Sequence, residues 1–391
     1  MIPYLLFRPI PYADETAASL LIRAAEENGH KNVYQLLAGK GIRINELGLR
    51  ACLIDPPRYR GLVQSLGLAD DAAALALERV GPSRRAPRCY RSIAIPDILF
   101  RRHEASAFCA ECLIEAPYWR QQWLIRPFSV CVKHLRLLVA HCLSCGKVPS
   151  IGRGNLTRCN HCKTSLLEMY GTSVCVDSMI SIQRMMDAHD VEPLGIILEF
   201  WETLLRFDEQ GDQPSAEHAR LDASVSFALG GIDAENYVAG LVEERLSSLH
   251  PRIQLEPFMS GTAPLKNFAE GIVDLVSPLP KIGTGLPSIS KLGKGEVCRV
   301  LDITALQLAE LIESGNLKWP QNGGRQRKIS ITDVEFMLHG FSLGEREVSH
   351  LASNEKIMDQ NAKRIVAHAD PRDESDGPPR LTWESFWRGE I

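Results

Sequence analysis

Four pairs of metal-type ligands, each pair separated by two residues, lie between positions 109 and 162 of this chain. They are Cys109/Cys112, Cys131/His134, Cys142/Cys145 and Cys159/Cys162. In chain order they form one set of three cysteines and a histidine and one set of four cysteines, and each set suits a tetrahedral zinc ion whose four positions are all filled by protein. Because such a site has no open position, we expect two structural zinc ions per chain in a protein that holds other macromolecules, rather than a metalloenzyme.

Two further histidines, His141 and His161, lie beside these ligands and could compete with His134. We prefer His134 because it alone restores the two-residue spacing. One of the two sets could also be degenerate and stay free of metal. The other cysteines occur singly, and we expect them to be small buried apolar residues: Cys52, Cys89, Cys175 and Cys298.

The composition is that of a globular protein of about two to four domains. The 391 residues are 45% hydrophobic and 24% charged, with a net charge of −4. A negative net charge does not suit a protein whose main ligand is a nucleic acid. Any nucleic-acid contact should therefore be confined to a local patch or made through a partner. We expect a cytoplasmic protein without membrane contact, because residues 1–11 lack the features of a signal peptide, no apolar run could span a bilayer, and paired metal-type cysteines suit a reducing compartment.

The predicted fold is mainly α, with a helix-turn-helix domain at the N-terminus, a tandem zinc-ribbon or knuckle module, a helical domain and a C-terminal winged helix-turn-helix. The predicted parts are 1–102 (helical domain with a basic linker), 103–175 (double zinc-finger module), 176–289 (helical domain and linker), 290–345 (winged helix-turn-helix) and 346–391 (polar tail with a terminal aromatic segment).

The N-terminal part should contain four helices. We expect Asp14 to cap a first helix that stops at Asn28-Gly29, and Asn32 to cap a second that ends at Gly39. Two more are predicted at about 57–66 and 71–80, with a turn between them. The last is rich in alanine and acidic residues and lacks side chains that read bases, so it favours binding of a partner protein over DNA.

Residues 81–102 form a basic segment with six arginines and one aspartate, a local charge of +5. They are Arg84, Arg85, Arg88, Arg91, Arg101 and Arg102, with Asp97. The segment could touch RNA or DNA phosphates, or it could be a solvated linker that packs on acidic neighbours. The sequence favours neither interpretation.

Aromatic residues in the zinc module are expected to be its core rather than a platform for bases: Tyr118, Trp119, Trp123 and Phe128. Residues 176–250 should be helical around a polar loop at 208–218. The stretch 257–287 is rich in proline and glycine and predicts a linker or a packed irregular loop.

The 290–340 stretch has the pattern of a winged helix-turn-helix. A helix at about 291–301 is followed by a turn at Asp302, and Thr304 with Gln307 forms a capping box that opens a second helix. A hairpin wing at 317–331 and a helix capped by Thr332 with Glu335 complete the pattern. The second helix carries no lysine or arginine, although the wing is basic, so we favour contact with proteins. The basic residues of the wing are Lys318, Arg325, Arg327 and Lys328.

The tail of the chain ends in an aromatic segment that could dock in cis or in trans, or pack on its own domain. Its apolar residues are Leu381, Trp383, Phe386 and Trp387. The sequence contains no phosphate-binding loop, HExxH motif or GxSxG motif. A zinc-containing nuclease or recombinase therefore has no residues to support it, and we expect a protein that is not an enzyme.

Two stretches resemble the TniQ family. The segment RPIPYADETAASLLIRAAEENGH (residues 8–30) resembles the start of TniQ proteins, and CAECLIEAPYWRQQWLIRPFSVCVKHLRLLVAHCLSCGK (residues 109–147) resembles their ligand order. The SLLIR start and the C-terminal pattern look most like the TniQ of type I-F CRISPR-associated transposons. Many TniQ proteins have Ser-Trp where this chain has Ser19-Leu20, which separates it from the stand-alone integration factors.

The resemblance implies a target-selection adaptor that neither cuts nor joins DNA. Such a protein binds the type I-F Cascade complex and its crRNA as a homodimer, against the crRNA-capping endonuclease subunit and the adjacent backbone subunit. It then recruits an AAA+ transposition regulator, and DNA contact is mostly indirect because the guide reads the sequence. The alternative is a stand-alone, sequence-specific DNA-binding target selector of a transposon.

Overall fold

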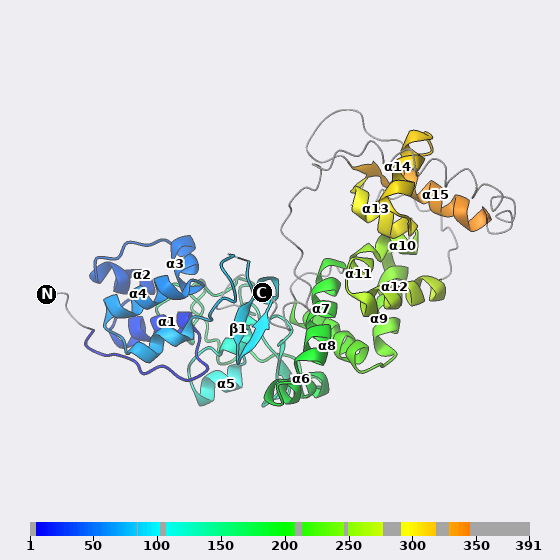
Figure 1. Cartoon of the computed structure of the whole chain (residues 1–391). Helices are drawn as coiled ribbons and strands as arrows, with labels where there is room; N and C mark the ends of the chain where they lie inside the picture. Colours follow the sequence, from blue (N-terminus) through cyan, green and yellow to red (C-terminus); the bar gives the residue numbers. More distant parts are fainter. Residues whose placement is uncertain are drawn as a thin grey trace. The chain divides into compact units, whose positions relative to one another are not determined.

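The computed structural model describes residues 5–83, 85–101, 107–207, 213–245, 249–276, 291–317 and 328–344. The chain divides into two compact units, Met1–Ala234 and Glu235–Ile391, and Figure 1 shows that both are mainly helical. No helix in the described ranges has the length and apolar character needed to cross a membrane.

Four short helices begin the first unit, and each starts at a side chain that caps it. They are α1 (Ala17–Glu27), α2 (Val33–Gly39), α3 (Glu46–Leu53) and α4 (Pro56–Leu66). Their N-caps, Thr16, Asn32, Asn45 and Asp55, each accept a hydrogen bond from a backbone N–H of the first turn. The predicted cap at Asp14 is wrong, because the residue that caps the helix is Thr16, two residues later. The sequence analysis did not predict α3.

The helix predicted at about 71–80 is also wrong. The chain forms only a 3-10 helix, η1 (Asp70–Leu75), and then extends. Glu78 accepts a backbone hydrogen bond from Cys89, and Val80 donates one to Pro87. These backbone groups therefore pair with the following strand instead of continuing a helix, so the described residues show no second helix for the predicted N-terminal helix-turn-helix.

The middle of the first unit consists of short elements between irregular loops. They are β1 (Arg88–Tyr90), β2 (Ile93–Ile95), η2 (Asp97–Leu99), α5 (Ala110–Glu115), η3 (Gln121–Leu124), β3 (Val130–Cys131) and β4 (Arg136–Leu137). Strands β1 and β2 pair antiparallel, as do β3 and β4. Arg91 and Ser92 connect β1 to β2 with positive φ at both positions, as a tight two-residue hairpin requires.

The N-terminal helices and the predicted zinc module share one hydrophobic core. It extends from Leu5 to Met169 and contains Leu20 and Leu21 of α1 beside Trp119 and Trp123. Both tryptophans are at most 2% exposed, which confirms that these two aromatic residues form core, whereas Tyr118 is only half-buried. A module of short elements therefore gains its stability from the helices it packs on as well as from any metal it holds.

Three longer helices end the first unit. They are α6 (Asp177–Asp187), α7 (Val191–Phe207) and α8 (Pro214–Ala228), and α7 packs against α8. Their apolar faces confirm the helical prediction for 176–250. The predicted polar loop at 208–218 is wrong in its second half, because α8 begins at Pro214, where the fixed φ of proline suits a first turn. Residues 208–212 of the predicted loop lie outside the described residues.

The second unit starts with helices where a linker was expected. Helix α9 (Asp233–Arg245) spans the boundary of the two units, and α10 (Pro251–Gln254), α11 (Glu256–Met259) and α12 (Ala263–Leu275) follow. The prediction of irregular structure at 257–276 is wrong, since Pro257 and Pro264 lie in first turns, where proline is tolerated. Residues 277–290 are outside the described ranges.

The last elements are β5 (Lys291–Leu292), α13 (Lys294–Leu301), α14 (Ala305–Glu313), β6 (Ile329–Ser330) and α15 (Ile331–Gly344). The helix pair, the left-handed turn at Asp302 and the Thr304–Gln307 capping box agree with the sequence analysis. The first helix starts later than expected, because Lys291 and Leu292 pair antiparallel with β6.

The second predicted capping box is wrong. Helix α15 already begins at Ile331, so Thr332 lies inside it, and the Glu335 carboxylate accepts a hydrogen bond from the His250 backbone N–H instead. Most of the predicted wing, including Lys318, Arg325 and Arg327, lies outside the described residues. The same holds for the tail from 345 onward, with its aromatic segment.

Candidate metal centres

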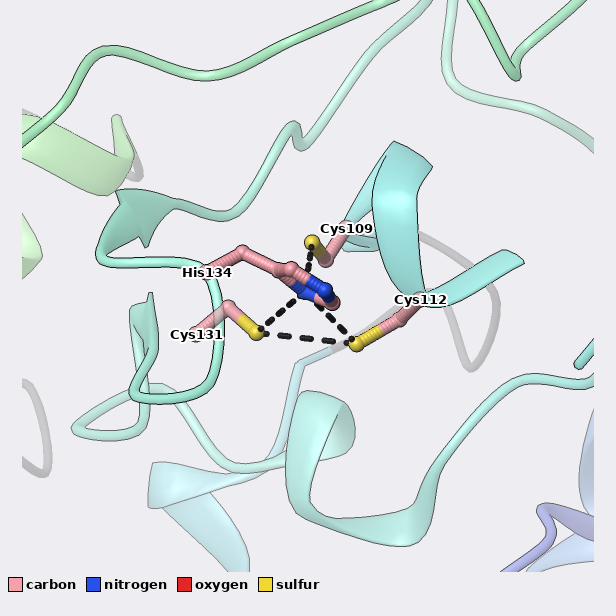
Figure 2. A group of neighbouring side chains, drawn as sticks. All are labelled: Cys109, Cys112, Cys131 and His134. Carbon is pink, nitrogen blue, oxygen red and sulfur yellow. Dashed lines mark hydrogen bonds between the residues drawn. The ribbon is translucent and has the colours of Figure 1, made fainter. Parts of the chain in front are cut away.

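The first cluster consists of Cys109, Cys112, Cys131 and His134, whose ligand atoms all lie within 4.8 Å of one another. The first pair lies at the start of α5, and the second comes from the β3–β4 hairpin, as Figure 2 shows. His134 Nδ1 is 3.4 Å from Cys109 Sγ, 3.3 Å from Cys112 Sγ and 3.4 Å from Cys131 Sγ. The sulfurs of Cys112 and Cys131 are 3.6 Å apart.

These separations fit a tetrahedral zinc ion. With ordinary zinc–ligand bond lengths, sulfur atoms at two corners are about 3.8 Å apart, and a sulfur and a nitrogen are about 3.5 Å apart. The observed distances agree within a few tenths of an ångström. The first cluster could therefore hold one zinc ion with no ligand position left over.

A carboxylate fixes the orientation of the histidine ring. His134 Nε2 lies 3.1 Å from Glu115 Oε1, while Nδ1 faces the sulfurs. This arrangement assigns the proton to Nε2, which donates to the carboxylate and leaves the Nδ1 lone pair free for a metal. Lys133 Nζ donates to the other oxygen of Glu115 at 2.5 Å. The hydrogen bond from Lys133, followed by that from His134, lowers the pKa of Glu115, so the carboxylate stays charged.

The second cluster consists of Cys142, Cys145, Cys159 and Cys162, again within 4.8 Å. The sulfurs of Cys142 and Cys162 are 3.5 Å apart, and those of Cys145 and Cys159 are 3.8 Å apart. Both distances are close to the separation of about 3.8 Å between two thiolate sulfurs that bind one tetrahedral zinc ion. Each cluster could thus hold a zinc ion, which matches the two structural ions expected from the sequence.

Tight turns explain why paired ligands two residues apart converge. The residue after the second ligand has positive φ in three of the four pairs: Leu135 (54°), Gly146 (69°) and Lys163 (65°). The turn closes with Gly146 N–H donating to the Cys142 carbonyl and Lys163 N–H donating to the Cys159 carbonyl. Glycine adopts this conformation freely, whereas Leu135 and Lys163 adopt it at a cost that ligand placement must offset.

The alternative histidines do not join either site. Within the described residues, the clusters contain neither His141 nor His161. His134 completes the first set geometrically, as its spacing suggested.

Close contacts between the sulfur atoms of the first cluster shift the pKa values of its thiols in opposite directions. Hydrogen bonds from the Cys109 and Cys112 thiols lower the pKa of Cys131. Hydrogen bonding to Cys112 and then to Cys131 raises the pKa of Cys109, whose proton is shared with those sulfurs. A zinc ion needs all three sulfurs deprotonated, so metal binding releases protons and weakens in acid.

A polar network anchors the start of α1 to the zinc-bearing region. The buried Glu15 carboxylate accepts hydrogen bonds from Ser19 Oγ at 2.6 Å and from Arg23 Nη1 at 2.7 Å. Ser19 Oγ in turn accepts one from the Trp119 backbone N–H at 3.0 Å. Burial raises the pKa of Glu15 despite these bonds. This role was not predicted from the sequence, although the four-residue spacing of Glu15, Ser19 and Arg23, at and just before the start of α1, is a signal that could have shown it.

This network and the first cluster lie in one stretch of sequence that has known relatives. The family model of TniQ matches residues 6–138. We call residues 6–138 the TniQ region. In this region, about a third of the chain, the protein is similar to TniQ, a family of transposon-associated target-selection proteins. No curated protein matches the chain in sequence.

Arg153 ties the second cluster, which follows the TniQ region, to the core of that region. Its buried guanidinium donates to the backbone carbonyls of Ser150, Asn155 and Leu156 and lies 4.5 Å from the ring centre of Trp119. Burial lowers the pKa of Arg153 to about 9, which leaves it charged at neutral pH. Sequence analysis did not single this residue out.

Part of the basic segment of the TniQ region is structural. Arg88 is buried and binds Asp97 at 2.8 Å, and Arg101 is buried and binds Glu217. For these two residues the interpretation as a segment packed on acidic neighbours is correct. Arg85 is exposed, and Arg91 is exposed with a long contact of 3.9 Å to Asp187. Arg84 and Arg102 lie outside the described residues.

Proposed function

We propose that this protein is a non-catalytic target-selection adaptor of an RNA-guided transposon. It binds a type I-F Cascade–crRNA complex as a homodimer, against the crRNA-capping endonuclease subunit and the adjacent backbone subunit. It then recruits the AAA+ regulator that brings the transposase. The observation that carries this proposal is the TniQ region at 6–138, which includes one complete four-ligand cluster.

The metal clusters support a scaffolding role. Each offers four protein ligands to its ion, so a bound zinc ion would have no position for water or substrate. Zinc in such sites stabilises the fold of the loops around it, and it does not supply a Lewis acid for phosphoryl transfer. The clusters are therefore suited to fixing binding surfaces in place.

The exposed face of α14 supports contact with proteins. This helix is the second of the pair at 294–313, the position that reads bases in a helix-turn-helix. Its exposed side chains include Leu306, Gln307, Glu310 and Glu313, and the helix contains no lysine or arginine. Carboxylates on this face would repel phosphates, so we assign the C-terminal module to partner proteins.

The second candidate is a stand-alone DNA-binding target selector. The family match is compatible with this candidate as well, because it does not distinguish the two branches. A base-reading helix would have to come from elsewhere in the chain, because the α14 face is acidic. The adaptor therefore remains our proposal.

Co-purification tests it. The tagged full-length protein should elute with a type I-F Cascade and its crRNA in size exclusion, and the mass should correspond to two copies per complex. As a control, Cascade assembled without its crRNA-capping subunit should lose the association. A protein that ignores Cascade but shifts a defined DNA duplex would overturn the adaptor proposal in favour of the stand-alone selector.

A further inference from the structure

The chain between Glu115 and Glu168 contains no acidic residue. It carries eight lysines and arginines, and it includes both the second half of the first cluster and all of the second. They are Arg120, Arg126, Lys133, Arg136, Lys147, Arg153, Arg158 and Lys163. This stretch is more basic than the 81–102 segment that the sequence analysis singled out, and its partners decide which of these charges are free.

Five of the eight cations are occupied within the protein. Arg126 and Arg153 are buried. Lys133 is paired with Glu115, and Arg136 with Glu111 at 2.7 Å. The Arg120 guanidinium lies 4.5 Å from the ring centre of Tyr118 and 5.0 Å from that of Trp123. These residues hold the fold together and offer little charge to a ligand.

The remaining three, Lys147, Arg158 and Lys163, are exposed. Among the described residues none of the three has a carboxylate within ion-pair distance. Lys163 Nζ donates to the neutral Asn160 carbonyl at 2.9 Å, which leaves its charge uncompensated. A charged side chain on a rigid loop without an acidic partner retains its attraction for an external anion.

The three cations belong to residues of the loops that carry the second cluster. Lys163 follows the ligand Cys162, and Arg158 precedes the ligand Cys159. The Lys147 backbone lies beside the ligand Cys142, whose N–H donates to the Lys147 carbonyl at 3.0 Å. Because the four sulfurs lie within 4.8 Å of one another, the backbones of all three residues lie close to one site. We call this group the knuckle rim.

The rim cations outnumber the negative charges of the site beside them. A zinc ion with four thiolates carries −2; Cys142 and Cys159 are fully buried, whereas Cys162 is exposed. Glu26 also reaches these loops, where it accepts hydrogen bonds from Asn155 and from the Leu156 N–H. Neither interaction of Glu26 occupies a rim side chain, so three positive charges stand against the two negative charges of the site.

We propose that the knuckle rim binds the phosphodiester backbone of a nucleic acid. Lysine and arginine side chains on preformed loops suit phosphate contacts, which position a protein on a nucleic acid without reading its sequence. Three phosphates are a small footprint, consistent with local contact by a chain whose net charge is −4. The inference goes beyond the adaptor proposal, because it assigns this protein a nucleic-acid contact of its own and needs no partner protein.

Fluorescence anisotropy of the full-length, zinc-loaded protein tests the proposal. The probes are a labelled RNA hairpin, a single-stranded RNA and a DNA duplex of matched length, each titrated at several salt concentrations. We expect binding to weaken with salt, and the variant Lys147→Ala/Arg158→Ala/Lys163→Ala to bind at least about 10-fold more weakly in low salt. The slope of log affinity against log salt should fall by about 2 to 3, close to one unit for each lost phosphate contact.

Arg58→Ala is the matched control. This exposed arginine lies on α4, in neither cluster, and its guanidinium already pairs with Asp55, so its removal should leave affinity and salt slope unchanged. Zinc content and melting temperature are measured for every variant, and the single variant Lys147→Glu replaces the triple variant if the latter loses zinc. A preference for the RNA probes or for the duplex identifies the source of the phosphates, and either preference supports the proposal.

Two results would overturn it: no salt-dependent binding of any probe by the wild type, or an unchanged affinity and slope in a zinc-loaded rim variant. These outcomes are separable from the adaptor proposal. A rim variant that loses nucleic acid but still co-purifies with Cascade leaves both proposals standing, whereas a wild type that binds the probes and ignores Cascade contradicts only the adaptor.

Discussion

Arg101 and Glu217 form a buried ion pair with two hydrogen bonds, although 116 residues separate them. The guanidinium Nη1 and Nη2 atoms lie 2.9 and 2.5 Å from the two carboxylate oxygens, and Arg101 Nε donates to the Trp123 carbonyl at 3.0 Å. The pair connects the loop before the zinc-bearing region to the first turn of α8, where the helix dipole also favours a carboxylate.

Breaking this pair should destabilise the first unit strongly. Glu217→Ala leaves the Arg101 cation buried without its counter-charge, which costs about 3 to 5 kcal/mol of unfolding free energy. Urea denaturation measures the loss. The matched control is Glu202→Ala, which removes the partner of the half-exposed Arg206 and should cost no more than about 1 kcal/mol. Equal effects of the two variants would mean that the Arg101–Glu217 pair is solvated in solution.

The Glu115 carboxylate should strengthen zinc binding through His134. Glu115→Gln keeps the shape of the side chain but weakens the acceptor for the Nε2 proton, and loss of such a partner typically lowers metal affinity by about 10- to 100-fold. Competition with a chromogenic chelator measures the change in affinity. Glu168→Gln alters an exposed carboxylate beyond the clusters and should have no effect. If both variants retain wild-type affinity, the ring of His134 is oriented by other groups.

Ser19 should stabilise the junction between α1 and the aromatic core. Its hydroxyl donates to Glu15 and accepts from the Trp119 N–H, so Ser19→Ala leaves buried polar groups without partners. We expect a loss of about 1 to 3 kcal/mol in chemical denaturation. Ser65→Ala on the exposed face of α4 removes only a bond to the Gly61 carbonyl and serves as the control. A loss no larger than that of the control would contradict the role of the network.

Alkaline pH should destabilise the protein through Tyr90. Burial raises the pKa of Tyr90 to about 12, above its unfolded value of about 10. The native state therefore keeps this proton where the unfolded chain has lost it, and the stabilisation present below pH 10 disappears as pH rises toward 12.

The difference is on the order of 2 kcal/mol. Tyr90→Phe should abolish this part of the pH dependence, as unfolding free energies between pH 9 and 12 would show, whereas the exposed Tyr170→Phe should retain it. An unchanged alkaline slope in Tyr90→Phe would place the sensitivity in other groups.

Local chemistry could be predicted from the sequence, and long-range pairing could not. The eight ligands, the caps at Asn32 and Thr304 and the buried tryptophans all depend on side chains close together in the sequence, and the structure places them as expected. The helix at 71–80 failed because Glu78 and Val80 pair with residues 87–89. The helical pattern of residues 71–80 does not reveal that a later segment pairs with these backbone groups.

For the same reason, the sequence left two interpretations of the basic segment open. The local charge of +5 for residues 81–102 does not include the ion pair that Arg101 forms with Glu217, outside the segment. It also does not show that Arg88 is buried against Asp97. Asp97 is close in sequence, but Glu217 is far from Arg101 and could not be assigned to it. Conversely, Lys147, Arg158 and Lys163 are scattered in the sequence, and their backbones come close together only through the second, all-cysteine cluster.

Native mass spectrometry of the full-length protein tests the central claim most directly, namely that these eight residues hold two structural zinc ions. Wild type and the control Cys175→Ser, at an exposed cysteine outside both clusters, should each carry two ions per chain. Cys112→Ser should carry one and lose the ordered packing of the first cluster. Two ions in Cys112→Ser with unchanged stability, or fewer than two in wild type purified without chelator, would contradict the assignment.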